Sequence, residues 1–432
     1  MQGRYRFGYL DLGRARTTSE QPPRRGDAAP PRPPARSRWL DRFEGSLGGR
    51  REDGPEGPRL VVRRLHRSDE VYGGRRLAEF LTVSRRSLGW LGRDPAVAEA
   101  DPREVVFLDC ETTGLAGGTG TKVFLVGVAR FGPDGLHVEQ HFLPDYDVER
   151  PFLAGADAAL SGAGYLATFN GKSFDLPLLD TRLALWRRRA DWLDLPHLDL
   201  LHPARRLWRR RLESCGLTAL EEQVLGFARE GDVPGWLIPG LYFGFLRTGD
   251  LAPLEPVFEH NRRDLLSLVV LATRLGRIVA GEEEPEHPLD SLGLARMLED
   301  CGEVERAIAA YERALEGDLP PEDRDEARAR LALLCKRLRR DERALAAWDA
   351  IVQGVGSRSA LALVELAKHY EHRARDYARA AEVTRRALRT LALRPEAATC
   401  GEASVEALER RLRRLERKVW RAEGCQRILG AD

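Results

Sequence analysis

Hydrophobic and polar positions predict strands in the middle of the chain. Residues 105–110 (VVFLDC) are almost continuously apolar, as expected of a strand that is covered on both faces of a sheet. Two further apolar stretches, at 122–131 and 136–144, are separated by the turn sequence PDG, which favours a hairpin. A shorter apolar run at 165–170 predicts a fourth strand. We therefore expect three antiparallel strands followed by at least one more strand.

Helical spacing of apolar residues accompanies these strands. It predicts helices near 149–160, 216–226 and 253–280, and another that begins close to Asp175. Residues 61–100 include a further segment with helical spacing, LAEFLTVSRRSLGWL, which leads into the strands. Strands that alternate with helices indicate an α/β domain, in which helices flank a mixed sheet.

The sequence after residue 287 is almost purely helical and repeats itself. The segment AIAAYERAL at 307–315 is echoed by ALAAWDAIV at 344–352 and more loosely by AAEVTRRAL at 380–388, at intervals of roughly 36 residues. Another apolar helical segment precedes each of them, and small alanines occur where paired helices would pack closely. The region resembles tetratricopeptide repeats, whose period is about 34 residues. A last amphipathic helix at 402–423 is expected to cap the array.

Composition divides the chain into five parts. Residues 1–60 are rich in Pro, Arg and Gly, so they bury too little apolar surface to offset the entropy of ordering, and we expect a disordered tail. Residues 61–280 form the α/β domain, and the acidic segment GEEEPEH at 281–287 is expected to be a linker. The helical repeats occupy 288–395, and 396–432 hold the capping helix.

Bulk properties narrow the class of protein. The chain has 432 residues, of which 43% are hydrophobic, so it can form two or three cores. Its basic residues are mostly arginine, which suits phosphate binding, although a bias in gene composition is the favoured explanation. The six cysteines form no CxxC pair, which argues against a zinc site or a disulfide framework. Signal-peptide and membrane-span patterns are lacking, so we expect a cytoplasmic protein without a membrane partner.

Two carboxylates end the first predicted strand. Side chains two positions apart share one face of a strand, so Asp109 and Glu111 point the same way and Cys110 points to the other side. Neighbouring carboxylates repel each other and resist burial, and a cation would relieve both costs. All-oxygen ligands favour Mg²⁺ or Mn²⁺ over zinc. An Asp-x-Glu pattern also arises by chance, and a solvated pair at a strand end is the alternative interpretation.

Further acidic residues follow in three places. Asp175 comes five residues after Asn170 in FNGKSFDLPLL, where a helix cap is the simpler interpretation. His260 and Asp264 are four positions apart in an amphipathic helix and therefore share one face, although a surface pair of polar residues is equally compatible with this spacing. Asp199 lies near another strand end, where a structural role is favoured over a metal ligand.

Taken together, these acidic residues resemble the motifs of a known superfamily. They occur in the order and approximate separations of the three motifs of DnaQ-like DEDD exonucleases, as Asp109, Glu111, Asp175 and Asp264. The segments SCGLTALEEQVLGF at 214–227 and IPGLYFGFLRTGD at 238–250 add a closer resemblance to the YprB-like branch of ribonuclease H-like proteins, which also has C-terminal repeats. The combination of motifs is specific, although no single motif is.

The resemblance implies an α/β ribonuclease H-like domain, with a mixed five-stranded-type sheet flanked by helices, and an all-α helical-repeat domain after it. It also implies a 3′→5′ exonuclease that uses two Mg²⁺ or Mn²⁺ ions on DNA or RNA, with single strands favoured. The implied metal ligands, which are also catalytic residues, are Asp109, Glu111, Asp175 and Asp264. The further implied catalytic residue is His260. The implied substrate-binding residues are Thr112, Thr113, Gly114, Asn170, Phe174 and Asn261.

His260 departs from the family pattern. Histidine-type members place the His five residues before the last Asp, and tyrosine-type members place a Tyr four residues before it. His260 combines the histidine chemistry with the tyrosine spacing, so it either orients the attacking water or takes its proton. Two alternatives to a nuclease are a catalytically silent nucleic-acid binder of the same fold and a scaffold that binds a protein partner through the repeats.

Overall fold

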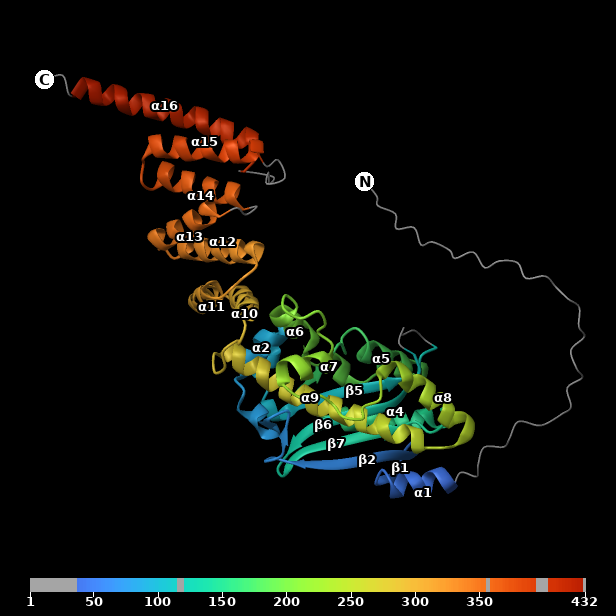
Figure 1. Cartoon of the computed structure of the whole chain (residues 1–432). Helices are drawn as coiled ribbons and strands as arrows, with labels where there is room; N and C mark the ends of the chain where they lie inside the picture. Colours follow the sequence, from blue (N-terminus) through green and yellow to red (C-terminus); the bar gives the residue numbers. More distant parts are fainter. Residues whose placement is uncertain (1–36, 115–119, 355–357, 394–402, 430–432) are drawn as a thin grey trace, which may run out of the picture.

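The computed structural model has two regions along the chain (Figure 1). It describes residues 37–114, 120–354, 358–393 and 403–429. A mixed sheet with helices on both faces comes first, and a stack of helices follows it toward the C-terminus. This order confirms the predicted α/β domain followed by an all-α region.

The large sheet has seven strands in the order β1-β2-β7-β6-β5-β8-β9. Their bounds are β1 (Gly49–Gly54), β2 (Gly57–Arg67), β5 (Val105–Thr112), β6 (Val123–Gly132), β7 (Gly135–Phe142), β8 (Tyr165–Thr168) and β9 (His197–Asp199). The central strand β5 pairs antiparallel with β6 and parallel with β8. The five strands from β7 to β9 form the expected mixed sheet, and β1 and β2 extend it at one edge. A separate small hairpin joins β3 (Val71–Tyr72) to β4 (Arg75–Arg76).

The expected disorder of residues 1–60 is wrong for residues 37–60. This stretch forms α1 (Ser37–Gly45), β1 and the start of β2, whereas residues 1–36 lie outside the described part of the chain. Phe43 of α1 is fully buried, and its ring lies 6.1 Å from that of Phe142 on β7. β1 is an edge strand, and its polar residues face solvent. The segment is therefore ordered by a few apolar contacts with the sheet, although its sequence is polar.

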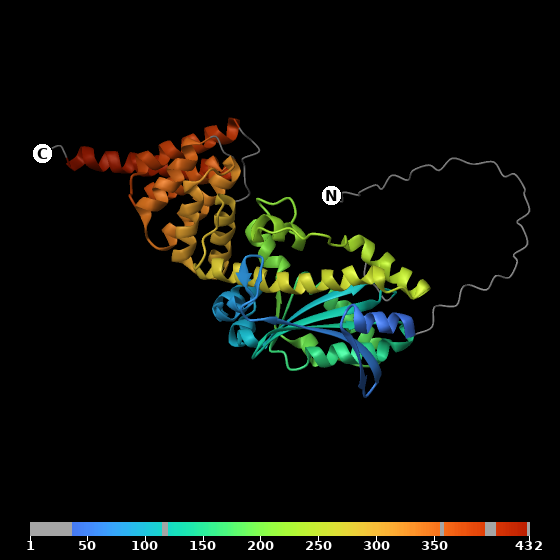
Figure 2. The same cartoon turned by 60° about the horizontal axis from the view of Figure 1, so that its bottom comes forward.

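Helices cover both faces of the sheet. They are α2 (Arg85–Gly92), α3 (Pro95–Glu99), α4 (Glu149–Leu160), α5 (Asp175–Leu185), α6 (Leu201–Trp208), α7 (Leu217–Leu220), α8 (Ile238–Thr248) and α9 (Glu255–Ala280). Val105 and Phe107 of β5 face a core shared with α2, α6 and α9, whereas Val106 and Leu108 face a core shared with α4, α5 and α8. Figure 2 shows the long yellow helix α9 crossing one face of the sheet. The continuous apolar run of β5 is therefore explained by burial on both faces.

The C-terminal region is a stack of helices. Its members are α10 (Pro288–Asp300), α11 (Val304–Glu316), α12 (Pro321–Arg337), α13 (Asp341–Gln353), α14 (Ser359–His372), α15 (Tyr377–Leu393) and α16 (Val405–Leu429). Each helix packs on the next one in sequence, and every repeated segment of the sequence forms a helix, as predicted. Among the described residues, no helix has the length and apolarity needed to cross a membrane.

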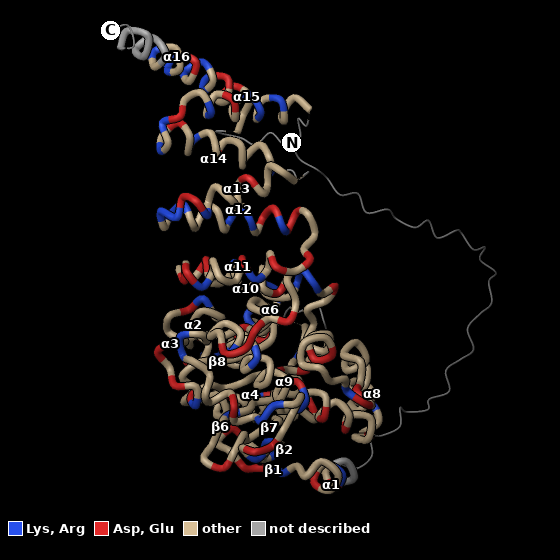
Figure 3. Tube along the Cα trace, turned by 60° about the vertical axis from the view of Figure 1, so that its left-hand side comes forward, with Lys and Arg blue, Asp and Glu red and all other residues tan. Residues whose placement is uncertain are grey.

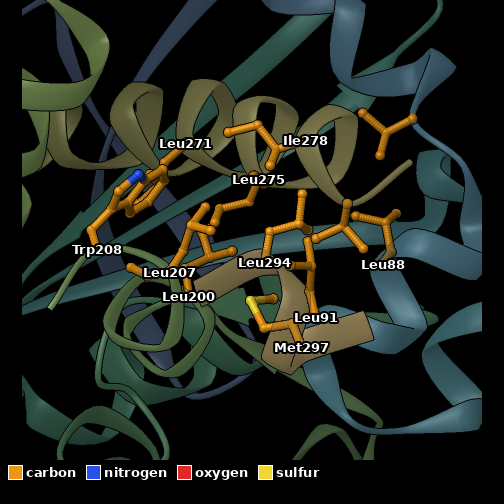
Figure 4. Close-up of a cluster of buried hydrophobic side chains, with 14 of the residues drawn as sticks. Leu88, Leu91, Leu200, Leu207, Trp208, Leu271, Leu275, Ile278, Leu294 and Met297 are labelled. Carbon is orange, nitrogen blue, oxygen red and sulfur yellow. The ribbon is translucent and has the colours of Figure 1, made fainter. Parts of the chain in front are cut away.

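The first helix of the stack, α10, packs directly on the α/β region. Figure 4 shows the shared apolar cluster, which includes Leu88, Leu91, Leu207, Trp208, Leu271, Leu275, Leu294 and Met297. Gly293 permits this approach, because a Cβ atom there would lie 2.6 Å from the carbonyl oxygen of Leu207. Arg211 also forms an ion pair of 2.9 Å with Asp290 of α10. The acidic connector is anchored as well, since Glu283 pairs with Arg75 at 2.6 Å.

Candidate metal and nucleic-acid site

The candidate site begins at the end of β5. Asp109 and Glu111 lie on the same side of this strand, and Cys110 is buried in the core on the opposite side, as the alternation predicts. Asp109 lies opposite Gly127 of β6. A side chain at 127 would reach within 2.2 Å of Oδ1 of Asn261, so this glycine lets α9 approach the sheet beside the two carboxylates.

Asn261 lies beneath the carboxylates and is fully buried. Its Nδ2 donates to Oδ2 of Asp109 at 2.7 Å and to the Asp109 carbonyl oxygen at 3.2 Å. Its Oδ1 accepts a hydrogen bond of 2.9 Å from Nε2 of Gln140. The expectation that Asn261 binds substrate directly is therefore wrong, because a side chain without exposed surface cannot touch a ligand. It orients Asp109 instead.

Asp175 is the first residue of α5, and its side chain is buried. The cap position belongs to Phe174, and no side chain caps this helix end, so the simpler interpretation of Asp175 as a helix cap fails. Burial raises the pKa of Asp175 to about 7, although a hydrogen bond with Cys110 opposes this rise. The carboxyl lies near enough to Asp109 and Glu111 to repel both, although it falls outside the tight group formed by Glu111, His260 and Asp264.

His260 and Asp264 complete the cluster from α9. Ligand atoms of Glu111, His260 and Asp264 all lie within 4.8 Å of one another. Nε2 of His260 is 3.5 Å from Oδ2 of Asp264, one helical turn away. The spacing of four along α9 therefore places both side chains toward Glu111, and the alternative of a solvated surface pair does not describe them.

The electrostatics of the cluster favour a bound cation. Burial is the main cause that raises the pKa values of Asp109 and Glu111 well above the usual range, and Asp264 and Asp175 add repulsion to each. Carboxylates crowded in this way are stabilised by a positive charge among them. Hard oxygen ligands with a single imidazole fit Mg²⁺ or Mn²⁺. The donor set of the site therefore fits the expected metal.

Two further residues of the site, Arg229 and Asp232, were not predicted from the sequence. Both come from the loop after the π-helical turn Glu221–Leu225. Nε and Nη2 of Arg229 donate to Glu221 at 2.7 and 2.5 Å, and Nη2 also contacts Asp264. Burial lowers the pKa of Arg229, but Glu221 and Asp264 outweigh this effect and hold it above its usual value. The polar sequence of the loop carries no motif that could have identified either residue.

Asp232 positions the imidazole of His260. Its carboxylate oxygens lie 2.9 and 3.0 Å from Nδ1. This contact fixes a proton on Nδ1 and leaves Nε2, the nitrogen that faces Asp264 and Glu111, free to accept a proton. A ring oriented in this way presents Nε2 for general-base chemistry.

The last residue of β5 and the loop after it supply three expected substrate-binding residues, Thr112, Thr113 and Gly114. Thr112 is buried, and its hydroxyl donates to the carbonyl oxygen of Gly114 at 2.8 Å. The N–H of Thr113 donates to the carbonyl oxygen of Lys122 at 2.9 Å, so this N–H is not available to a nucleotide. The loop continues into residues 115–119, which lie outside the described part of the chain.

The second loop, between β8 and α5, is shaped by Asp199. This buried carboxylate accepts hydrogen bonds from the N–H groups of Asn170 at 2.8 Å, Lys172 at 3.1 Å and Leu201 at 3.1 Å. The structural role expected for Asp199 is therefore confirmed. Asn170 has a positive φ of 68° and an exposed side chain, and Phe174 is partly exposed, so both remain accessible to a substrate.

Comparisons with known proteins show which proteins this chain is similar to. A family model of the ribonuclease H superfamily matches residues 106–276, a range that contains all the acidic residues of the site. The chain is 34% identical over 355 residues to the uncharacterized protein YprB of Bacillus subtilis, covering 81% of this chain and 82% of that protein. A solved family B DNA polymerase from Pyrobaculum calidifontis is 14% identical, with a TM-score of 0.33. That match covers 54% of this chain and 29% of the polymerase, and the fold assignment does not depend on it.

Proposed function

This chain belongs to the YprB family and has a ribonuclease H superfamily domain, and from this premise we propose that it is a metal-dependent 3′→5′ exonuclease. The proposed substrate is single-stranded DNA or RNA, cleaved at its phosphodiester bonds. The observation that carries the proposal is the close grouping of Glu111 of β5 with His260 and Asp264 of α9. Asp109 and Asp175 lie near enough to this group to add repulsion among the carboxylates. The polarity of digestion and the preference for single strands come from the family resemblance.

The chain's own carboxylates would hold two divalent ions, Mg²⁺ or Mn²⁺. The ligands would be Asp109, Glu111, Asp175 and Asp264. Such a pair of ions would supply an activated water and charge stabilisation at the leaving oxygen. Asn261 holds Asp109 in one orientation, and Arg229 contacts Asp264, so two ligands are positioned before a metal binds.

His260 would act on the attacking water. Asp232 holds its Nδ1, so Nε2 is the atom that accepts the proton of the water. This arrangement assigns a base function to a histidine whose spacing to Asp264 differs from that of histidine-type relatives. Thr112, Thr113 and Gly114 would shape the pocket for the terminal nucleotide through their loop, and Asn170 and Phe174 would contact it directly.

Release of mononucleotides from end-labelled strands tests the proposal. Single-stranded DNA and RNA labelled at the 5′ or the 3′ end are incubated with Mn²⁺ or Mg²⁺. Release of the 3′ label as a mononucleotide, together with shortening of the 5′-labelled strand one residue at a time, is the expected result. Activity that survives a chelator, or a first product released from the 5′ end, would contradict it.

A matched pair of substitutions on one helix provides the control. Asp175→Asn removes a proposed ligand, and Asp180→Asn makes the same change at an exposed position five residues later on α5. We expect the first to lower kcat by at least 10²-fold and the second to leave it unchanged. Equal activity of the two variants would refute the assignment of the site.

A second part of the proposal is that the helical stack binds a protein partner. Its consecutive packed pairs and the roughly 36-residue echoes in sequence support tetratricopeptide-type repeats that bind a protein partner. A scaffold that acts mainly through these repeats is the alternative function. It predicts that substitutions in the acidic site leave the biological activity intact. A cytoplasmic location completes the proposal.

A further inference from the structure

The last helix, α16, has two faces of different character. Leu408 and Leu415 are fully buried on the side where α16 packs on α15. On the opposite side, Arg413 and Arg417 are exposed, and Trp420 is 75% exposed. Because an α-helix advances 3.6 residues per turn, these exposed positions fall on one stripe along the helix.

Arginine continues this stripe in both directions. Arg410 and Arg421 are also exposed, so four guanidinium groups and one indole follow one face; Figure 3 shows basic residues recurring along the helix. We call the set Arg410, Arg413, Arg417, Trp420 and Arg421 the α16 stripe. Within the described residues, no acidic partner lies within 4.0 Å of Arg413, Arg417 or Arg421.

Acidic residues near the stripe leave its charge positive. Arg410 lies 3.7 Å from the exposed Glu406. Glu416 is bound to Arg385 of α15 at 2.9 Å, and Glu409 is exposed at the side of the stripe. The three arginines without a described partner therefore keep their full charge toward solvent.

The stripe is not needed to hold α16 in place. A separate set of basic residues does this by converging on the buried Glu371 of α14. Arg411 donates to it at 3.0 Å, Arg414 at 2.8 and 2.9 Å, and Lys418 at 2.9 Å. Since other side chains dock the helix, Arg413, Arg417, Arg421 and Trp420 have no structural partner among the described residues that would explain them.

The chemistry of the stripe fits single-stranded nucleic acid. Guanidinium groups bind phosphates, and an exposed indole stacks on an unpaired base. The bases of a duplex are already stacked on one another and present no such face. An acidic membrane is a poor fit, because the apolar side of α16 is buried on α15 and Trp420 is the only large apolar residue of the stripe.

We propose that the α16 stripe is a second binding site for single-stranded nucleic acid, separate from the acidic cluster. It lies at the far end of the helical stack from the α/β domain (Figure 1). The choice of occupant rests on the proposed nuclease function, whereas binding itself requires no cleavage. The site retains a long strand whose end is processed elsewhere on the same molecule.

Binding to a fluorescein-labelled deoxythymidine homopolymer tests the site. Fluorescence anisotropy is measured in EDTA over a range of salt concentrations, with the full chain and three stripe variants. The combined change Arg413→Gln, Arg417→Gln and Arg421→Gln should weaken binding at least tenfold and reduce the salt slope by about 2, because each phosphate contact on a single strand contributes about 0.7. Trp420→Ala should weaken binding about tenfold, and Trp420→Phe should restore most of it.

A charge-matched control separates this site from a general loss of positive charge. The combined change Arg51→Gln, Arg64→Gln and Arg337→Gln removes the same charge from exposed positions on β1, β2 and α12. We expect near wild-type binding from it. The proposal is overturned if this control weakens binding as much as the stripe variant, if the stripe variant binds normally, or if vesicles of anionic lipid bind wild type more tightly than the strand does.

A second readout separates this proposal from the nuclease proposal. Hydrolysis of the small substrate thymidine 5′-monophosphate p-nitrophenyl ester should be equal in wild type and the stripe variant, whereas degradation of a long strand should slow at least tenfold in the variant. If no nuclease activity exists but strand binding still depends on the stripe, the nuclease proposal fails and the α16 site stands. If cleavage occurs but the stripe variant binds the strand as tightly as wild type, the α16 site fails and the nuclease proposal stands.

Discussion

Asn261 of α9 donates a hydrogen bond of 2.7 Å from Nδ2 to Oδ2 of Asp109 at the end of β5. Gln140 of β7 fixes the amide from the other side by donating to its Oδ1 at 2.9 Å. A chain of hydrogen bonds thus leads from the middle of the sheet to the first carboxylate of the site. The direction of Asp109 is set by the core, before any ligand arrives.

Removal of this amide should weaken metal binding. Asn261→Ala leaves Asp109 without its donor and Gln140 without one acceptor. We expect a 10- to 100-fold loss of Mn²⁺ affinity by calorimetric titration, in the range found for residues that orient metal ligands. The free energy of unfolding should also fall by about 1–3 kcal/mol.

Thr273→Ala is the control for this variant. Thr273 is buried on the same helix and donates to the carbonyl oxygen of Val269 at 2.8 Å, away from the carboxylates. It should lose stability without any change in Mn²⁺ affinity. If Asn261→Ala also binds Mn²⁺ as tightly as wild type, Asn261 does not orient the site.

The contact between Asp232 and His260 predicts a shared catalytic effect. Asp232→Asn removes the charge that holds the imidazole, so we expect kcat to fall about 10²-fold with little change in KM. Because the two residues act as one unit, the double variant with His260→Ala should be no slower than His260→Ala alone. Glu230→Gln, at an exposed position of the same loop, should be neutral. Additive losses in the double variant would argue that Asp232 does not work through His260.

Gly293 should control the junction between the α/β domain and the helical stack. Gly293→Ala places a methyl group within 2.6 to 3.0 Å of the backbone of α6, which cannot yield without moving α10. We expect a loss of about 1–3 kcal/mol in the free energy of unfolding, measured with denaturant. Gly244→Ala is the matched control, because that helical glycine has open space at its Cβ position and alanine there should stabilise by up to about 1 kcal/mol. A neutral Gly293→Ala would show that the junction is loosely packed.

Glu371 should make the docking of α16 sensitive to acid. Burial alone would raise the pKa of Glu371, but hydrogen bonds from Arg414 and Lys418 outweigh it and lower this pKa to about 2. Because the folded pKa lies below the ordinary value of 4.5, the stabilisation is complete above that value and is lost as the pH falls toward about 2. Glu371→Gln should therefore lower Tm at neutral pH, and the gap to wild type should narrow in acid. Glu382→Gln, an exposed change on α15, should give no such trend. A gap that is constant with pH would contradict the assignment.

The sequence predicted most of the elements because their patterns are local. The apolar run of β5 and the amphipathic spacing of α9 each report burial directly, and both elements lie where they were expected. The hairpin of β6 and β7 was visible for the same reason. Strands β1 and β2 were missed. The polar residues of β1 face solvent, and β1 is ordered by pairing with β2, which in turn pairs with β7 far along the chain.

In the candidate site, too, relations within one element were predictable and relations between elements were not. Sequence alone determined that Asp109 and Glu111 share a face, and that His260 and Asp264 share another, because strand and helix periods fix these relations within one element. Only the tertiary structure decided that the two faces meet, that Asn261 is buried beneath Asp109 instead of contacting substrate, and that Arg229 and Asp232 join the site. Those relations depend on how α9 packs on the sheet and where a distant loop folds back, and no local period records either.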